Sequence, residues 1–371
     1  MNRNTGMSAG QIIGTMNGQQ VVGLDIAKLV FQMHTVNMGT GEIVNVQIKR
    51  AKVLEHFANL TPCLVAIEAC GGAHHWAREL GKLGHTVRLL HAKIVRPFVT
   101  GNKTDATDAR AIWLAVQQPG VKFVGVKTIS QQATLTLHRQ RELLMKMRIM
   151  QTNALRSLLY EFGATFAKGK KALFKEIEAT LEGLADTLPQ MVRDSLREQV
   201  ARIKAIEVDM KAIEVRLQLQ LKLDPQMQRI AQIPGVGLLT ATAAIATMGE
   251  AGAFKSGREF CAWLGLVPKQ TGSGGRVKLL GISKRGDGYL RTLLIHGARR
   301  GKSACQRAGA MVGADQGSPP LQCGVCSAGG QNGQNDLGRN RQGAGLPERL
   351  QKRQATSGVT PKSIRKDKAT Q

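Results

Sequence analysis

Between residues 20 and 125, short apolar runs alternate with segments of helical spacing. VVGLDIAKLVFQMHTV at 21–36 and GEIVNVQI at 41–48 have the β-branched content and alternation of strands. CLVAIEAC at 63–70 and HTVRLLHA at 85–92 are short apolar runs of the same kind. Helical spacing or glycine-bounded segments separate them at 50–60, 71–84 and 105–116. This alternation predicts an α/β domain with a mixed sheet over 20–125.

The pattern changes between about 126 and 225. Two long stretches, 135–163 and 192–223, carry apolar residues at steps of three and four with charges between them. This spacing predicts two long amphipathic helices. They can pair as a coiled-coil arm or pack in a bundle, and periodicity fits both.

A third region, 226–300, is predicted to be mainly α. It opens with IPGVGLLTATAAIATMG at 233–249, and a glycine-rich basic loop follows between two helical segments. Gly235 and Gly237 allow backbone N–H groups to approach a phosphate, as in a helix-hairpin-helix-like element. A tight structural turn explains them equally well.

The two ends lack such patterns. Residues 1–19 are predicted to be a flexible leader, and 301–371 lose all periodicity in a Gly-, Gln- and Asn-rich composition typical of disorder. One CxxC at 323–326 has no second pair, so it does not indicate a zinc site.

Charge narrows the range of partners. The chain has 52 Lys and Arg against 26 Asp and Glu, a formal net charge of +26, and a pI of about 10.4. Such an excess favours a nucleic-acid partner. No apolar run is long enough for a membrane helix, and the first residues do not have the apolar core of a secretion signal. Six cysteines in so long a chain do not indicate a disulfide framework. We therefore expect a cytoplasmic protein without a membrane partner.

Four acidic residues stand out against this basic background. Asp25 and Glu68 each lie in an otherwise apolar strand, where a carboxylate costs several kcal/mol unless it is paired or bound to a cation. Asp105 and Asp108, three residues apart, lie on one face at the start of a helix. Helix chemistry alone explains this second pair, since Thr104 or Asp105 can cap the helix and acids suit its first turn.

Taken together, the four acids predict a metal site. Strand ends and helix starts of a mixed α/β sheet meet at one edge, so the four carboxylates can converge. Two divalent cations about 4 Å apart would activate a nucleophile and stabilise the leaving oxygen of a phosphodiester. Mg²⁺ suits such oxygen ligands, with Mn²⁺ as the alternative. In a basic protein, this predicts strand chemistry on nucleic acid.

Several motifs in fixed order carry a family resemblance. GLDIAK at 23–28, AIEACGGAHHWA at 66–77 and NKTDATDARAIW at 102–113 resemble the DEDD-type insertion-sequence transposases (the IS116/IS110/IS902 type). The resemblance continues through IPGVGLLTATAAIA to HGARR, over about 20–300. It implies an RNase H-like (RuvC-like) N-terminal domain. It also implies that Asp25, Glu68, Asp105 and Asp108 are the catalytic metal ligands.

The same resemblance implies a second chemical centre. The family has a serine thought to attack the DNA backbone and form a 5′-phosphoserine link, and the matching residue is Ser273 in TGSGGR. Thr271 is a neighbouring hydroxyl. Without the resemblance, an ordinary flexible loop touching phosphates is the simpler interpretation. The candidate phosphate contacts, whose alternative is a solvated basic face, are Arg276, Lys278, Lys284, Arg285 and Arg291.

Family likeness also implies partners. These are DNA at the element ends and target, a structured non-coding RNA that guides the reaction, and a homo-oligomer, dimer or tetramer, in which sites from different subunits meet. A helical arm at 129–222 suits such an assembly. His74 and His75 either contact the site or a phosphate, or are ordinary exposed histidines at a helix start.

The tail departs from the family. We hypothesise a frameshift in the gene after about residue 301, because a shifted reading of 331–341 resembles the family's usual terminal helix. Two alternatives to an active transposase therefore stay open. One is a Mg²⁺-dependent junction-resolving nuclease, and the other is an inactive nucleic-acid-binding remnant.

Overall fold

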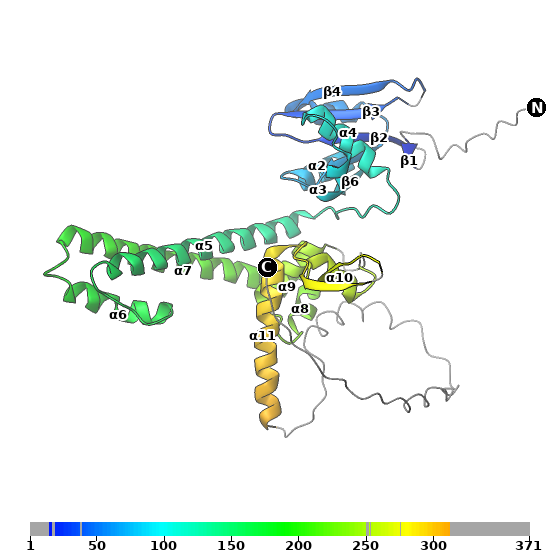
Figure 1. Ribbon diagram of the computed structural model, residues 1–371. Coiled ribbons are helices and arrows are strands. Elements are labelled where there is room, and N and C mark those ends of the chain that lie inside the picture. Colours follow the sequence, from blue (N-terminus) through cyan, green and yellow to red (C-terminus); the bar gives the residue numbers. More distant parts are fainter. Residues whose placement is uncertain are drawn as a thin grey trace, which may run out of the picture. The chain divides into compact units, whose positions relative to one another are not determined.

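The computed structural model describes residues 15–16, 19–37, 39–249, 252, 254–274 and 276–311 (Figure 1). Within the predicted leader, Thr15–Met16 form β1 and pair antiparallel with β2. The rest of the leader up to residue 14, the CxxC at 323–326 and the tail from 312 lie outside the described residues.

A mixed sheet organises the N-terminal domain (Figure 1). Its strands follow the order β4-β3-β2-β5-β6, with β1 beside β2. β2, β3 and β4 are antiparallel, whereas β5 and β6 run parallel to β2. Their bounds are β2 Gln19–Asp25, β3 Val30–Val36, β4 Ile43–Lys49, β5 Leu64–Glu68 and β6 Thr86–Leu90. The α/β prediction for this domain is confirmed.

Helices cover both faces of the sheet. On one face, η2 (Arg50–Lys52) leads into α1 (Val53–Ala58), which packs with α2 (Ala73–Lys82) on a core that includes Trp76. On the other, α3 (Ala92–Val95), η3 (Arg96–Phe98) and α4 (Asp105–Val116) pack on a core that includes Trp113. Both tryptophans are 5 % exposed, as expected for core residues.

Helix α4 lies unusually close to the middle strand β2. A Cβ added at Gly23 would lie 2.3 Å from the carbonyl oxygen of Ala109 and 2.7 Å from the backbone nitrogen of Trp113. The Trp113 indole Nε1–H donates to the Val21 carbonyl at 3.1 Å and fixes the helix along the strand. A glycine is therefore required where the helix crosses the strand.

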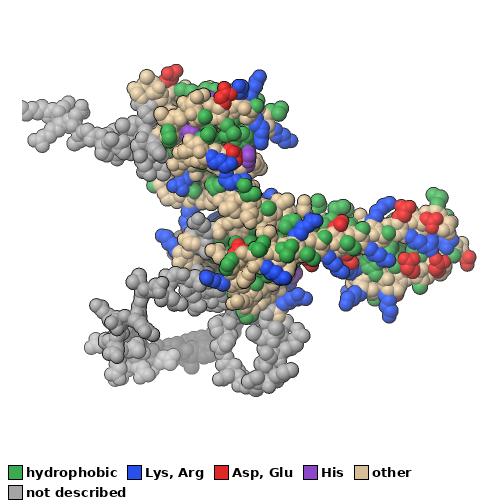
Figure 2. Space-filling model, turned by 180° about the vertical axis from the view of Figure 1, so that it is seen from behind, with side chains coloured by type: hydrophobic (Ala, Val, Ile, Leu, Met, Phe, Trp, Pro, Cys, Tyr) green, Lys and Arg blue, Asp and Glu red, His purple; other side chains and the backbone are tan. Residues whose placement is uncertain are grey.

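The predicted long helices are α5 (Ile129–Tyr160) and α7 (Gln190–Leu223), which pack along each other. A shorter helix that the sequence did not indicate, α6 (Lys170–Gly183), adds Leu173, Ile177 and Leu181 to their shared core. Arg141 pairs with Glu214 across the two long helices at 2.7 Å, and charges of both signs follow the arm (Figure 2). Coiled-coil geometry stays a prediction.

The C-terminal domain combines helices with one hairpin. Its elements are α8 (Pro225–Ala231), α9 (Leu238–Met248), α10 (Gly257–Leu264), β7 (Pro268–Thr271), β8 (Lys278–Ile282) and α11 (Gly288–Met311). The loop predicted between helical segments is therefore largely a β-hairpin. Helix α11 continues past the boundary predicted at 300, as far as Met311.

None of the helices in the described ranges is long and apolar enough to cross a membrane.

A buried histidine joins three helices of this region. His138 of α5 contacts the Thr242 hydroxyl of α9 through Nε2 at 2.9 Å and the Tyr289 hydroxyl of α11 through Nδ1 at 3.0 Å. Thr242 donates its own proton to the Leu238 carbonyl at 2.7 Å, so it accepts from Nε2–H. In the neutral ring Nδ1 is then the acceptor, and Tyr289 donates to it. Burial lowers the pKa of His138 to about 4.

We expect Gly23→Ala to destabilise the N-terminal domain by about 2 kcal/mol or more, because overpacking forces α4 away from β2. Thermal or urea unfolding of the full chain measures this. The matched control is Gly81→Ala, where nothing lies within 4 Å of the added carbon and a helix-interior alanine is favoured. Equal stability of the two variants would contradict the proposed close contact.

His138 makes stability depend on pH. The unfolded chain binds a proton near the ordinary pKa of 6.5, while the folded chain binds it only near 4. Stability from this neutral group is therefore present above 6.5 and falls as pH drops from 6.5 to about 4, by at most about 1.4 kcal/mol per pH unit. His138→Gln should flatten the stability curve in that window. An unchanged slope would show that His138 is not held neutral.

Candidate active site at the carboxyl edge of the sheet

Asp25 and Glu68 end two neighbouring parallel strands. Leu24 of β2 is in register with Ile67 of β5, so the two acids occupy the next register position. Side chains alternate along a strand. Asp25 therefore follows Val21 and Gly23 onto the face that α4 covers, and Glu68 follows Leu64 and Ala66 onto the same face. Both acids are half-buried at the carboxyl edge.

Asp105 and Asp108 approach this edge from the start of α4. Thr104 is the N-cap, since its hydroxyl accepts from the Thr107 backbone N–H at 3.2 Å, and Thr107 Oγ1 in turn accepts from the Thr104 N–H at 3.0 Å. This reciprocal capping box leaves neither aspartate with a capping role. Both suit the positive end of the helix dipole, but capping does not explain them.

Three of the carboxylates act electrostatically on the fourth, Asp25. The pKa of Asp25 is raised to about 6, first by burial and then by the negative charges of Asp108, Asp105 and Glu68. A hydrogen bond from the Ile26 backbone opposes this shift. Each of the other three acids therefore lies near enough to Asp25 to raise its pKa.

No Lys or Arg in the described ranges forms a salt bridge with any of the four. Within the same ranges, no three His, Cys, Asp or Glu side chains form a group ready to hold a metal ion. The acids therefore form a charged cluster and not a closed cage. Uncompensated carboxylate oxygens are the donor set that a hard divalent cation takes, so these residues fit such an ion.

Ser273 lies at the tip of the β7–β8 hairpin, whose strands are exposed. The Arg276 backbone N–H donates to the Ser273 carbonyl at 3.2 Å, closing a tight turn. Within this turn, a Cβ at Gly272 would lie 1.9 Å from the Arg276 carbonyl oxygen. The turn thus holds an exposed hydroxyl three residues before Arg276 and five before Lys278.

The predicted nucleic-acid contacts divide into two groups. Gly235 and Arg291 have structural roles. Gly235 has a φ of +85° and packs on the Gly297 backbone of α11, and the Arg291 guanidinium donates to the carbonyls of Leu264 and Gly286. The exposed group comprises Gly237, Arg276, Lys278, Lys284 and Arg285. The turn interpretation of the glycines therefore accounts for Gly235.

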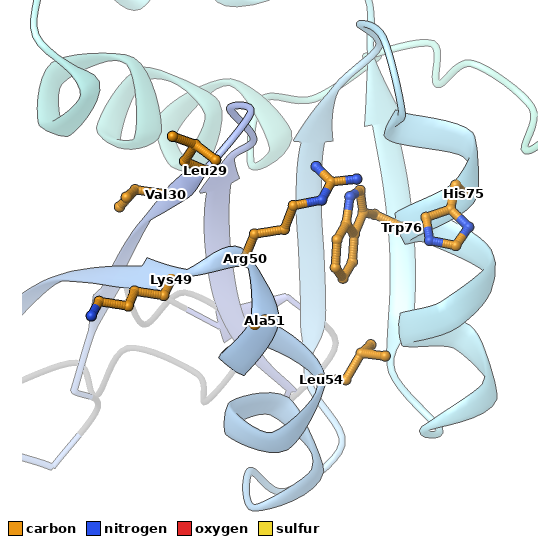
Figure 3. A pocket seen from close by; sticks show the side chains of 8 residues that line it. All are labelled: Leu29, Val30, Lys49, Arg50, Ala51, Leu54, His75 and Trp76. Atoms are coloured by element: carbon orange, nitrogen blue, oxygen red, sulfur yellow. The ribbon is translucent and has the colours of Figure 1, made fainter.

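A hollow of about 760 Å³ lies on the opposite face of the sheet and was not evident in the sequence (Figure 3). Leu29, Val30 and Leu54 contribute apolar surface, and the Arg50 guanidinium lies 5.1 Å from the centre of the Trp76 ring. It is lined by the α2 side of the domain and contains none of the four acids. It is therefore separate from the carboxylate cluster.

Comparisons with protein families agree with this arrangement. A model of DEDD transposases of the IS110 type, described as "Transposase", matches residues 22–163. A second, described as "Transposase IS116/IS110/IS902 family", matches residues 227–311 and ends where α11 ends.

Curated relatives extend over most of the chain. A "Probable family 20 transposase" of Pseudomonas aeruginosa is 44% identical over 285 residues, 76% of this chain and 84% of the relative. The "Transposase for insertion sequence element IS1111A" of Coxiella burnetii is 38% identical over 292 residues, covering 77% and 78%. The "Transposase for insertion sequence element IS1328" of Yersinia enterocolitica is 37% identical over 279 residues, covering 75% and 83%.

The charge cluster predicts an unusual effect on stability. Without divalent ions at pH 7.5, Asp25→Asn should stabilise the chain by about 1–2 kcal/mol, because it removes a half-buried like charge. Below pH 4 the gain should vanish, since Asp25 is then protonated in the wild type. Thermal unfolding measures both, with the exposed Asp209→Asn as control. A destabilised Asp25→Asn at pH 7.5 would contradict the cluster.

Proposed function

The chain belongs to the IS116/IS110/IS902 family of insertion-sequence transposases, and on this premise we propose that a carboxylate-held metal site and Ser273 together cut and rejoin DNA. Transposases of this family are DNA-cutting and rejoining enzymes. The observation that carries the metal proposal is the charge coupling of Asp25 to Glu68, Asp105 and Asp108 at one sheet edge.

The N-terminal domain is best assigned to the RNase H-like class. The strand order β4-β3-β2-β5-β6 supports this, with three antiparallel strands followed by two parallel ones and helices on both faces. In mixed sheets of this kind, ligands bind at the carboxyl ends of strands. Asp25 and Glu68 end two such strands.

Asp25, Glu68, Asp105 and Asp108 would hold divalent ions, Mg²⁺ or alternatively Mn²⁺. Bound there, such ions would activate the attacking oxygen and stabilise the charge of the leaving one. The carboxylates themselves neutralise and orient the ions. Thr104 and Gly23 position two of them indirectly, through the helix start and its close packing on β2.

Ser273 would be the nucleophile. Its Oγ forms a bond to phosphorus, the bond from phosphorus to the 3′ oxygen breaks, and the serine proton is transferred to that oxygen. The products are a 5′-phosphoserine link and a free 3′-hydroxyl. To rejoin DNA, the 3′-hydroxyl of a new strand would attack the phosphoserine, and the serine hydroxyl would be released. Exposure at the hairpin tip supports access to a phosphate.

Exposed basic residues would hold the DNA backbone around this hydroxyl. Arg276 and Lys278 flank the turn, while Lys284 and Arg285 lie beyond β8. Gly237 offers its backbone at the start of α9, with open space around its α-carbon. These contacts position DNA and carry no sequence information themselves.

We extend the proposal to a structured non-coding RNA as guide and to a homo-oligomer, dimer or tetramer, working in the cytoplasm on nucleoid DNA. The high positive charge and the long α5–α7 arm support it. A frameshift would have to fall after residue 311, because the family match extends to that residue. Sequencing the gene and translating its other reading frames tests this, because a frameshift predicts an intact continuation in one of them.

Excision and rejoining of element-end DNA with Mg²⁺ and the element's RNA test the function. Asp25→Ala and Ser273→Ala should each reduce recombination below about 10⁻³ of the wild-type rate while DNA binding is kept. Thr271→Val, a neighbouring hydroxyl, and the distant Asp209→Asn should both leave the rate near normal.

Each half of the proposal has its own contrary result. Normal recombination by Asp108→Asn would remove the metal assignment. Covalent protein–DNA product from Ser273→Ala would remove the serine assignment. Strand cleavage that needs the acids but not Ser273 would identify a nuclease instead.

A further inference from the structure

A second cluster, of positive charge, lies beside the first turn of α2. His74 and Arg78 lie one turn apart on this helix, and Lys127 precedes α5 in the chain. The Arg78 guanidinium donates to the Lys127 carbonyl at 2.6 Å, and the Lys127 backbone N–H donates to His74 Nδ1 at 3.2 Å. All three residues are half-buried. The sequence indicated only His74 as a candidate.

The contact between His74 Nε2 and Lys127 Nζ brings two hydrogen-bond donors together. Because Nδ1 accepts from the Lys127 backbone, the neutral ring carries its proton on Nε2. That Nε2 lies 3.4 Å from the Lys127 ammonium nitrogen. An ammonium has three donors and no acceptor. Two donors therefore face each other, and the structure supplies no acceptor between them.

Charge balance agrees with this geometry. No Asp or Glu in the described ranges forms a salt bridge with His74, Arg78 or Lys127. Burial, followed by the charges of Lys127, Arg78 and Arg139, lowers the pKa of His74 to about 4. Burial and then the charge of Arg139 lower the pKa of Lys127 as well, and the charge of Asp287 raises it. The charged forms of His74 and Lys127 are therefore both disfavoured, first by burial and then by neighbouring positive charges.

We propose that His74 Nε2 and Lys127 Nζ together bind one backbone phosphate of the DNA. A phosphate oxygen between the two donors would accept from both and offset the charge of Arg78. This inference rests on the proposed function, since it takes DNA as the bound polyanion. It assigns to the N-terminal domain a DNA contact separate from the basic residues around the hairpin.

The position of the cluster favours DNA at the active edge. The segment between Glu68 and α2 turns at this edge: the Cys70 N–H donates to the Glu68 carbonyl at 2.8 Å, and the Ala73 N–H donates to the Cys70 carbonyl at 3.3 Å. His74 follows four residues later, in the first turn of α2. A phosphate held there would keep the strand beside the carboxylates, which by themselves repel it.

The test is the salt dependence of DNA binding by the full chain without divalent ions. Fluorescence anisotropy with a labelled duplex from the DNA flanking the gene gives affinity between about 50 and 200 mM salt. Lys127→Met should reduce the slope of log affinity against log salt by about 1. Lys127→Arg should restore it. Lys82→Met, at the other end of α2 and 69% exposed, is the matched control.

An unchanged slope for a Lys127→Met chain that melts normally would overturn the proposal. So would a change seen with single-stranded RNA but not with the duplex. Should Lys127→Met fold poorly, ¹⁵N-histidine NMR of the wild type decides: the His74 Nε2 signal, assigned by its loss in His74→Gln, must shift on adding duplex. No shift overturns the proposal.

Neither measurement involves cutting. If the salt slope does not change, the carboxylate and serine proposal is unaffected. If Asp25→Ala still recombines, the salt dependence of DNA binding can still be measured.

Discussion

The close packing of α4 on β2 is the constraint on which the N-terminal domain depends. Gly23 lets the helix backbone approach the strand, and the Trp113–Val21 hydrogen bond fixes its position along it. This contact fixes where the start of α4, with Asp105 and Asp108, lies relative to the strand that ends in Asp25. The negative charges of the other three acids act on Asp25, and a bound cation would relieve this repulsion.

Much of this arrangement could be predicted from the chain alone. Strand and helix signals are local, so the sheet elements and the long helices were evident, and Asp25 and Glu68 stood out because they are charged positions in apolar strands. Convergence of the four acids is expected from the general geometry of mixed sheets, and the charges of the other three acids raise the pKa of Asp25. Helix capping is the ordinary explanation for acids at a helix start. Because Thr104 and Thr107 form the capping box, capping does not account for Asp105 and Asp108.

Features that depend on distant contacts were missed. Helix α6 is stabilised by packing between α5 and α7. Gly235 meets Gly297, and Arg291 holds the carbonyls of Leu264 and Gly286, through contacts that no local pattern shows. The pairing of Lys127 with His74 joins residues 53 positions apart. Glycine and polar residues weaken the helical pattern after 300, so the sequence does not show that α11 continues to Met311.

The two charged clusters have complementary roles in this account: acids without counter-ions for the metal, and bases without counter-ions for the phosphate. A crystal of the full chain grown with Mn²⁺ tests the central claim most directly, through the anomalous signal of the ion. We predict a peak contacted by Asp25, Glu68 and at least one of Asp105 and Asp108. No peak there, with the four carboxylates apart, would contradict it.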